Sequence, residues 1–368
     1  MTDELFYQIA LTMINGVGGI LSRQLLSAFG DARTIFQEKK QTLERVPGIG
    51  TILAQEIKRP DVLEKAEREV AFIEKSRIQP LTLTDELYPE RLKECPDAPL
   101  VLYFKGNADL NAKHIISIVG TRHITPYGQE QTERLIEELS GLFHDTLIVS
   151  GLAYGVDVLA HKCALKQQMP TVGVLAHGLD RIYPPAHRST AIAMLEQGGL
   201  LTDFPSGTEP ERANFLKRNR IIAGLSDATI VVESATKGGS LVTADLAFGY
   251  NREVFAFPGR TTDRYSAGCN LLIRKKKAEI AISAADIADE LGWGQIPPAP
   301  PCKQTELFEE ANPETRKVVD CLLREKEMHV NQIARQSGIP VQELSNILFE
   351  LEMDGRIQAL PGNMFSLT

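Results

Sequence analysis

The sequence predicts an α/β protein built on a doubly wound parallel sheet, with a helical domain before the sheet and a winged helix after it. Apolar runs of strand length alternate with helical patterns between residues 114 and 290. Strands that are apolar on both faces and separated by helices are typical of parallel sheets. Residues 1–80 carry helical patterns, and residues 313–368 combine helical patterns with a hairpin.

Composition narrows the class of protein. The chain has 368 residues, and its 43% hydrophobic and 24% charged content is that of an ordinary soluble protein with more than one domain. The sequence has no apolar run long enough to cross a bilayer and no signal pattern at its start. We therefore expect a cytoplasmic protein without a membrane partner.

Net charge and cysteine content argue against several further classes of protein. A net charge of −8 argues against a general, histone-like nucleic-acid binder, although a local basic patch can still dominate the field at a groove. The five cysteines form no C-x-x-C pair, which predicts reduced thiols rather than a disulfide framework or a zinc site. We expect neither a metal nor a cofactor.

The N-terminal helical domain, residues 1–80, carries two related turns. Residues 14–19 and 46–50 each place a G-x-G pattern before a helix, which is typical of helix–hairpin–helix units. Two interpretations stay open: binding of duplex DNA without sequence preference, and a docking domain that has lost DNA binding. An amphipathic helix at residues 61–77 and edge strands at residues 80–84 and 100–104 are expected to follow.

The sheet domain, residues 81–290, should supply the parallel strands. We expect them at residues 115–119, 147–149, 172–175, 200–203, 229–232 and 254–257. Ligands of doubly wound sheets bind outside the carboxyl ends of the strands. The functional loops should therefore be residues 120–128, 150–155, 176–183, 204–219, 233–240 and 258–268.

Glycine-rich loops follow several of these strands. Gly120 lets the backbone approach a ligand, Thr121 offers a hydroxyl, and Arg122 can hold a phosphate with its planar fork. This loop is not G-x-G-x-x-G, and no acidic residue ends the next strand, so we do not expect NAD. Ser150 and Gly151 open a second loop. A third loop offers backbone N–H groups and hydroxyls from Lys237, Gly238, Gly239, Ser240 and Thr243.

Asp157 and His161 follow the second loop with the i, i+4 spacing of one helix face. The pair could act as an acid and a base or as two metal ligands. Without a third ligand at a suitable spacing, we favour a structural role, with His161 hydrogen-bonded inside the protein.

Residues 214–226 form a basic segment on an acidic chain. The apolar residues at its end predict a buried helix whose first turns carry the cations. Cations are disfavoured at a helix start, so we infer that a phosphate is their partner. The alternative is a solvated basic turn paired with Glu209 or Glu211. The candidate binding residues of this segment are Phe215, Lys217, Arg218, Asn219 and Arg220.

The sequence predicts a linker and a second folded module at the end of the chain. Residues 291–312 are rich in proline and without periodicity, which predicts a semi-rigid linker. Residues 313–368 have the element order of a winged helix. Its candidate recognition helix is acidic and would repel a phosphate backbone, so we favour protein contact over base reading.

Six motifs in order resemble the DNA-processing protein A (DprA/Smf) family. They are G-T-R-x(4)-Y-G at 120–128, S-G-L-A-x-G-x-D-x-x-A-H at 150–161, G-L-D-x-x-Y-P at 178–184, R-N-R-I-I-A-G-L-S at 218–226, G-G-S-L-V-T-A at 238–244, and F-P-G with G-x-N-x-L-I at 257–273. The flanking modules also look like those of the family. The resemblance implies a Rossmann-like sheet domain between a helix–hairpin–helix (SAM-like) domain and a winged helix.

The resemblance also implies a function. Such a protein binds single-stranded DNA in natural transformation, protects incoming strands, and loads the recombinase RecA onto DNA coated by single-strand-binding protein. It works as a homodimer and is not expected to be an enzyme. Arg122, Lys217, Arg218, Asn219 and Arg220 should form the DNA pocket, with Gly239 and Ser240 lining it and Phe215 stacking on a base.

Two other functions compete with this one. A nucleotide-processing hydrolase of the lysine-decarboxylase-like phosphoribohydrolase type shares such a sheet, but residues 238–243 lack the glutamate that this chemistry needs. A sequence-specific regulator would use the winged helix, against which the acidic recognition helix argues.

Overall fold

The computed structural model describes residues 2–294, 313–324, 327–353, 356–360 and 362–367, which fall into two compact units divided between Ile296 and Pro297. We describe each unit by itself. No helix in these ranges is both long and apolar enough to span a membrane.

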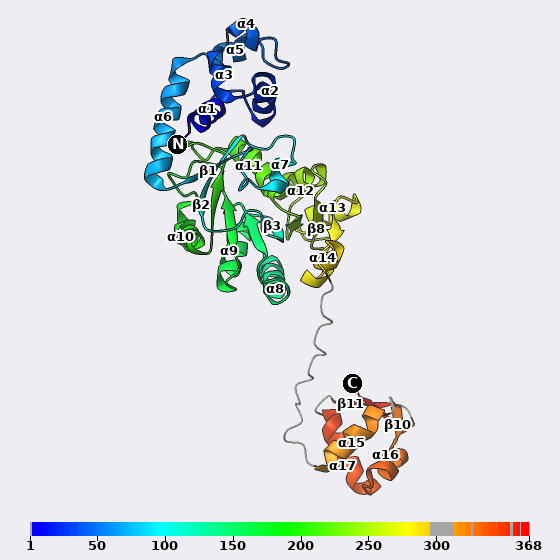
Figure 1. Ribbon diagram of the computed structural model, residues 1–368. Coiled ribbons are helices and arrows are strands. Elements are labelled where there is room, and N and C mark those ends of the chain that lie inside the picture. The colour runs from blue at the N-terminus through cyan, green and yellow to red at the C-terminus, as the bar shows by residue number, and fades with distance from the viewer. Residues whose placement is uncertain (1, 295–312, 325–326, 354–355, 361, 368) are drawn as a thin grey trace. The chain divides into compact units, whose positions relative to one another are not determined.

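The first unit is built on one large sheet (Figure 1). The strands stand in the order β1-β2-β6-β5-β4-β3-β7-β8-β9, with parallel pairing from β6 to β9 and antiparallel pairing at β1 and β2. The predicted doubly wound α/β fold is thus confirmed, and each expected strand is present. The strands are β1 Gln79–Thr82, β2 Val101–Gly106, β3 Ile115–Val119, β4 Leu147–Ser150, β5 Thr171–Val174, β6 Gly198–Thr202, β7 Ala228–Val231, β8 Glu253–Ala256 and β9 Glu279–Ile280.

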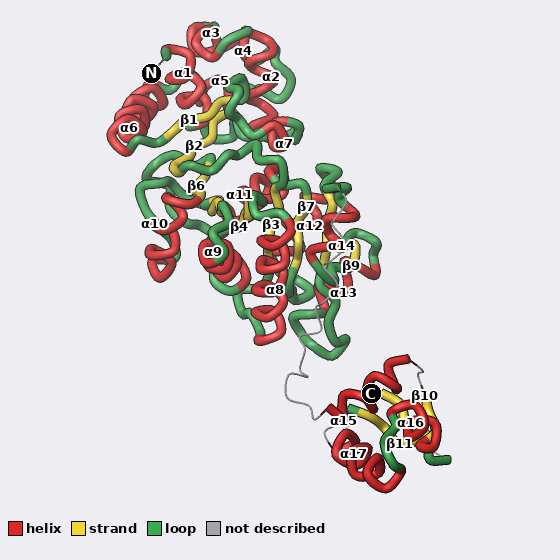
Figure 2. The backbone as a smooth tube through the Cα atoms, turned by 60° about the horizontal axis from the view of Figure 1, so that its bottom comes forward, coloured by secondary structure: helices red, strands yellow, loops and turns green. Residues whose placement is uncertain are grey.

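Helices cover both faces of this sheet (Figure 2). Ile115 and Val119 of β3 pack with α7, α11, α12 and α13, whereas Ile116 and Ile118 pack with α8, α9 and α14. This alternation follows from the two-residue repeat of a strand. The helices are α7 Glu90–Lys93, α8 Pro126–Leu142, α9 Val156–Lys166, α10 Arg188–Gln197 after the 3-10 turn Pro185–His187, α11 Arg212–Leu225, α12 Gly239–Gly249, α13 Ala267–Arg274 and α14 Ala284–Glu290.

The strand order reverses between β3 and β7. The chain runs outward from β3 through β4 and β5 to β6, and then returns to place β7 on the other side of β3. A crevice forms outside the carboxyl ends of the strands at such a switch point. The fold therefore directs a ligand to the loops that follow β3 and β7.

Six helices precede the sheet and share a core with it (Figure 1). This core includes Val101 and Tyr103 of β2, so the predicted boundary near residue 80 falls inside one compact unit. The helices are α1 Asp3–Thr12, α2 Gly19–Phe29, α3 Ala32–Gln37, α4 Lys40–Leu43, α5 Thr51–Ile57 and α6 Pro60–Ser76.

The two hairpin turns of this helical part pack against each other reciprocally. Gly16 and Gly48 have φ of 87° and 85°, a conformation that favours glycine. A Cβ at Gly16 would press on Leu53 of α5, and one at Gly48 would press on Leu21 of α2. These glycines thus allow close packing between the two turns.

Trp293 corrects the predicted start of the linker. Its ring stacks on His114 with centroids 4.3 Å apart and meets Phe143 edge-on at 5.5 Å. The packed part of the first unit therefore extends past residue 291, because an aromatic side chain gains from burial. Residues 295–312, the rest of the predicted linker, lie outside the described residues.

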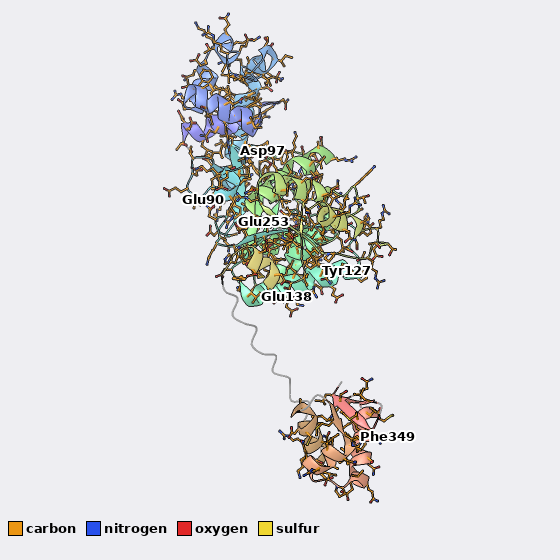
Figure 3. The ribbon with its side chains drawn as sticks, turned by 90° about the vertical axis from the view of Figure 1, so that its right-hand side faces the viewer. Glu90, Asp97, Tyr127, Glu138, Glu253 and Phe349 are labelled. Carbon is orange, nitrogen blue, oxygen red and sulfur yellow. The ribbon has the colours of Figure 1, made fainter. Side chains whose placement is uncertain are left out.

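The second unit has the predicted winged-helix element order. Its strands pair in the order β10-β12-β11. Phe349 projects from α17 and is 64% exposed (Figure 3). The elements are α15 Pro313–Arg324, β10 Glu327–His329, α16 Val330–Ser337, α17 Val341–Met353, β11 Ile357–Leu360 and β12 Met364–Leu367.

Candidate nucleic-acid interface

A cavity of about 740 Å³ lies at the switch point, between the loops after β3 and β7 and the helices α11 and α12. We call it the switch-point groove. Most of the candidate residues line it, although they come from three separate segments of the sequence. The candidates that line it are Gly120, Thr121, Arg122, Phe215, Arg218, Asn219, Lys237, Gly238, Gly239, Ser240 and Thr243.

The loop after β3 is held close to the start of α9. The Thr121 N–H donates to the Glu233 carbonyl at 2.8 Å, and the Val156 N–H donates to the Thr121 carbonyl at 3.2 Å. A side chain at Gly120 would overlap that of Val156, and one at Gly155, whose φ is 78°, would overlap Thr121. The glycines therefore hold Thr121 and Arg122 at the mouth of the groove.

Glu233 anchors the other end of this loop. Its carboxylate accepts hydrogen bonds from the Thr125 N–H at 2.9 Å and the Thr125 hydroxyl at 2.6 Å. Gly128 leaves the space that this carboxylate occupies. Glu233 is therefore a structural brace between β7 and α8.

Arg218 is a buried cation beneath the groove and is 3% exposed. Its Nη1 donates to the Val174 carbonyl, and its guanidinium fills the space beside Gly151. Burial lowers the pKa of Arg218 to about 10, against the attraction of Asp157, so the side chain keeps its charge at neutral pH. Burial raises the pKa of Asp157, whose carboxylate accepts from the Gly151 N–H at 3.2 Å.

Phe215 places an aromatic ring among cations. The guanidinium of Arg122 lies 5.3 Å from the ring centroid and that of Arg218 lies 5.9 Å from it, within cation–π range. The ring of Tyr183, which is 42% exposed, is 6.0 Å away. An aromatic surface flanked by guanidinium groups can stack on a nucleobase beside its phosphate.

The start of α12 forms the opposite wall. The helix begins at Gly239 without a side-chain hydrogen bond at its cap, Gly238. A helix start carries positive partial charge on its N–H groups, so this wall favours an anion. The Ser240 hydroxyl is turned inward and donates to the Ser234 hydroxyl at 2.9 Å.

Several candidate residues lie elsewhere. The Ser150 hydroxyl is buried and donates to the Ile118 carbonyl at 2.6 Å, and Gly151 lies beneath Arg218, so both support the groove without lining it. Lys217 and Arg220 line other cavities, on the far side of α11. Arg220 pairs with Asp203 and donates to the Asp97 carbonyl.

The helix-start argument for the basic segment is wrong. Helix α11 begins at Arg212, so Lys217 and the residues after it lie beyond its first turn. Of the two partners named in the alternative, Glu209 pairs with Arg181 instead, and Glu211 has no ion pair among the described residues.

His161 has the expected structural role. Its Nδ1 lies 2.7 Å from the Thr171 hydroxyl, which itself donates to the Ile148 carbonyl, so His161 is the donor of this pair. Burial lowers the pKa of His161 to about 3. Across the described ranges, no group of three or more His, Cys, Asp or Glu side chains is placed to hold a metal ion.

An aromatic and a basic side chain of the lining were not among the residues predicted from the sequence. Tyr183 lies in one of the expected functional loops but carried no separate signal as a binding residue. Arg212 is the first residue of α11 and adds another cation to the groove. The position of Arg212 just upstream of the basic segment could have indicated a binding role.

Comparison with known proteins decides the family. The model of the DNA recombination-mediator protein A family matches residues 79–292, which is more than half of the chain, and the DprA winged helix domain matches residues 297–363. The chain belongs to the DNA-processing protein A (DprA/Smf) family.

Two curated relatives align with most of this DprA/Smf family member. Protein Smf of Synechocystis sp. is 31% identical over 98% of both chains. Protein Smf of Escherichia coli is 35% identical over 82% of this chain and 80% of its own.

Two solved structures share the fold at similar identity. DprA of Streptococcus pneumoniae has a TM-score of 0.64 at 29% identity, over 79% of this chain and 98% of its own. DNA processing protein A of Helicobacter pylori has a TM-score of 0.52 at 30% identity, over 59% of this chain and 97% of its own. The latter structure is described in terms of a single-stranded DNA binding mode.

Proposed function

We propose that this chain binds single-stranded DNA in the switch-point groove and acts in DNA processing during natural transformation and recombination. In this role it protects incoming strands and loads the recombinase RecA onto DNA coated by single-strand-binding protein, as a homodimer. The observation that carries the proposal is the ring of Phe215 within cation–π range of the guanidinium groups of Arg122 and Arg218. The H. pylori relative supports the same ligand class.

The charge of the groove suits a phosphate backbone. Its described lining includes the cations Arg122, Arg212, Arg218 and Lys237, and one carboxylate, Asp157, which is buried beside Arg218. Four cations to one carboxylate on an acidic chain give a local positive field that attracts an anionic polymer. Stacking on Phe215 and Tyr183 would add binding that does not depend on sequence, because every base has an aromatic face.

The groove gives less support to the nucleotide-hydrolase alternative. Asp157 is the lining carboxylate in the described chain, and it is engaged with the Gly151 N–H. A glycosidic hydrolase needs a carboxyl group that reaches the scissile bond. Release of a free base from a nucleoside monophosphate by the purified protein would favour the hydrolase instead.

Fluorescence anisotropy tests the proposal. Labelled oligo-dT and a matching duplex are titrated with the protein at several salt concentrations. We expect preference for the single strand, and Arg122→Ala should weaken binding and lower the salt slope by about 0.7. Arg188→Ala removes an exposed arginine outside the groove and is the matched control. Preference of the protein for the duplex would contradict the proposal. So would equal affinity of Arg122→Ala and Arg188→Ala for the single strand.

A further inference from the structure

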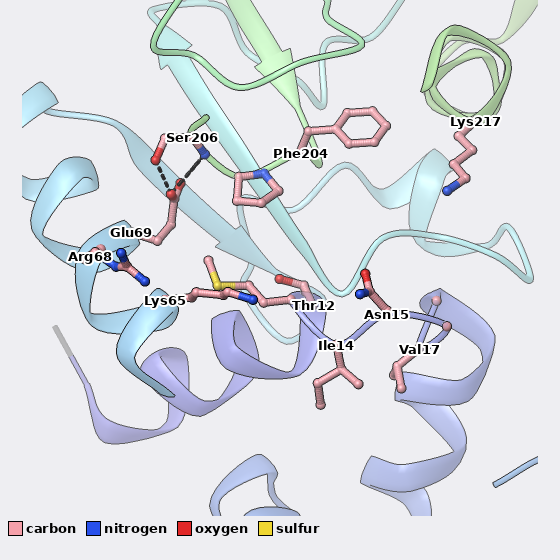
Figure 4. Close-up of a pocket in the computed structure, with 14 residues that line it drawn as sticks. Thr12, Ile14, Asn15, Val17, Lys65, Arg68, Glu69, Phe204, Ser206 and Lys217 are labelled. Carbon is pink, nitrogen blue, oxygen red and sulfur yellow. Dashed lines mark hydrogen bonds between the residues drawn. The ribbon is translucent and has the colours of Figure 1, made fainter. Parts of the chain in front are cut away.

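A second cavity, also of about 740 Å³, lies between the N-terminal helices and the loop after β6 (Figure 4). We call it the interdomain groove. The first hairpin turn, residues 12–18, forms one wall, α6 contributes Lys65, Arg68 and Glu69, and residues 204–206 with Lys217 complete it. The groove therefore joins the helical part of the first unit to the same helix, α11, that borders the switch-point groove.

The side chains of the interdomain groove leave an excess of positive charge. Lys217 and Arg68 are exposed and have no ion pair with the described residues. The Arg68 Nε donates to the Glu64 carbonyl at 3.4 Å, which leaves both terminal guanidinium nitrogens for a ligand. Lys65 pairs with Asp61 at 2.9 Å but remains half exposed.

Glu69 offsets only part of this charge, because it is one carboxylate against three cations of the lining. It is 4% exposed and accepts hydrogen bonds from the Ser206 N–H at 2.9 and 3.0 Å and from the Ser206 hydroxyl. In Figure 4 its carboxylate points at Ser206, while Lys217 extends from α11 toward the turn that carries Asn15. The carboxylate thus fastens α6 to the loop after β6.

A neighbouring cavity of about 400 Å³ continues the groove along the first hairpin. Its own charges are already engaged: Arg220 pairs with Asp203, and Asp97 accepts from the Tyr250 hydroxyl at 2.7 Å. Lys217 lines both cavities. It lies at their junction and has no ion pair with the described residues.

Helix α11 borders both grooves. Leu216 lines the switch-point groove, and the next residue, Lys217, lines the interdomain groove. A helix with its side chains is about 10–12 Å across, a distance that a few nucleotides of extended strand can cover. One polymer can thus reach both grooves by crossing the early turns of α11.

We propose that the interdomain groove holds backbone phosphates of the same DNA strand that occupies the switch-point groove. The inference rests on the proposed function and deepens it, because it makes the N-terminal helical part a member of the single-strand site. Arg68, Lys65 and Lys217 hold phosphates there as exposed cations. The groove binds a continuation of the strand, so it contributes only to strands longer than the switch-point groove can hold.

The first hairpin is packed against the sheet part of the unit. A side chain at Gly19 would overlap the Ala98 carbonyl, so this hairpin is seated against the sheet part of the unit. The second hairpin, residues 46–50, borders a different cavity. The two hairpins therefore have unlike surroundings, and the first one borders the groove that we assign to the strand.

Charge reversal on α6 tests the inference in the full chain. The double variant Lys65→Glu, Arg68→Glu is compared with Lys75→Glu, which changes an exposed lysine on the last turn of the same helix. Each protein is titrated with oligo-dT of about 6 and about 30 nucleotides, one near the lower end of the usual range of site sizes and one well above it. Melting temperature and circular dichroism confirm that each variant is folded.

We expect the double variant to bind the long strand about tenfold or more weakly at low salt, with the salt slope lowered by about 1.4. Its affinity for the short strand should match that of the parent protein, and Lys75→Glu should bind both strands normally. Equal long-strand affinity in the double variant and the parent would overturn the inference. An equal loss of affinity for the short and the long strand would also overturn the inference. The same holds if the double variant loses affinity for duplex DNA alone.

Arg122→Ala separates this inference from the proposed function. If Arg122→Ala weakens both lengths while the double variant changes neither, the inference alone fails. If Arg122→Ala changes neither length, the proposed switch-point site fails. As a second measurement, photocrosslinking of iododeoxyuridine placed near one end of the long strand should label residues 12–18, and labelling only in the sheet part would contradict the inference.

Discussion

Helix α11 presents one side to the switch-point groove and the other to the interdomain groove. On the first side, Arg218 is buried and Phe215 is partly open. On the other, Lys217 is exposed and Arg220 is held by Asp203. Neighbouring basic residues of one segment thus have different environments: one supports the groove floor, one belongs to an internal ion pair, and one is free for a ligand. Basic character alone does not reveal these roles, and each role makes a different prediction.

The largest effect should come from Arg218→Ala. The substitution leaves the buried Asp157 without its nearby cation and opens a space beside Gly151. Removing a buried cation that stabilises a neighbouring carboxylate, together with the space that its side chain leaves, should cost about 3–5 kcal/mol in free energy of unfolding. Chemical denaturation measures this cost, and the exposed Arg188→Ala is the control. A change below about 1 kcal/mol would show that Arg218 does not support the groove.

Loss of the ion pair between Arg220 and Asp203, on the other side of α11, should have a smaller effect on stability. Arg220→Ala removes a partly buried hydrogen-bonded charge pair with Asp203, and we expect a loss of about 2 kcal/mol in the free energy of unfolding. A double-mutant cycle with Asp203→Ala should give a cost below the sum of the single costs. Additive costs would mean that the two side chains are not energetically coupled.

His161 provides a pH-dependent test of the buried side. Its folded-state pKa of about 3 lies below the ordinary value of 6.5, so the unfolded chain binds the proton more readily. The contribution of neutral His161 to the free energy of unfolding is fully present above about pH 6.5. It is lost as the pH falls toward 3, by up to about 1.4 kcal/mol per pH unit.

Denaturation of the parent and of His161→Gln between pH 4 and pH 7 measures this slope. Asp157, with its raised pKa, contributes a slope of opposite sign, but it is present in both proteins and drops out of the difference. We expect the variant to have the shallower loss of stability in acid. If the stability of the two proteins changed with pH in parallel, His161 would accept a proton in the folded state at its ordinary pKa.

Phe215 and Lys217 should affect DNA binding with little effect on stability. Phe215→Ala should weaken single-strand binding by about 1–3 kcal/mol, the range for one stacked base. Phe349→Ala, an exposed phenylalanine on the second unit, is the matched control. Unchanged affinity of Phe215→Ala would remove the stacking part of the proposal.

Lys217→Ala should produce the smallest change. An exposed lysine contributes about one phosphate contact, so we expect a few-fold weaker binding, a salt slope lowered by about 0.7, and stability within about 0.5 kcal/mol of the parent. The loss should appear on long strands and vanish on short ones, because Lys217 lines the interdomain groove. An equal loss on short strands would place Lys217 at the switch-point groove instead.

The fold was largely predictable because its signals are local. Apolar runs locate the strands, and the carboxyl-end rule then brings the loop of Arg122 and the loop of Gly238 to one edge although they lie far apart in the sequence. The winged helix followed from its element order in the same way.

The roles of the basic residues were not predictable because they depend on tertiary packing. The start of α11 at Arg212, and the contacts of its residues with Val174, Gly151 and Asp203, decide which cation is buried. Tyr183 reaches the groove from a loop whose path the sequence did not reveal. Trp293 sits in a proline- and glycine-rich stretch, and its ring contacts with His114 and Phe143 show that it belongs to the sheet unit.

The reciprocal packing of the two hairpin turns has a mechanical consequence. Gly16 and Leu21 of the first hairpin have the same spacing as Gly48 and Leu53 of the second, and each glycine receives the other hairpin's leucine. A side chain at either glycine would press on the opposite hairpin, so the two turns act as one interlocked unit. The wall that the first turn gives to the interdomain groove therefore depends on the second turn as well.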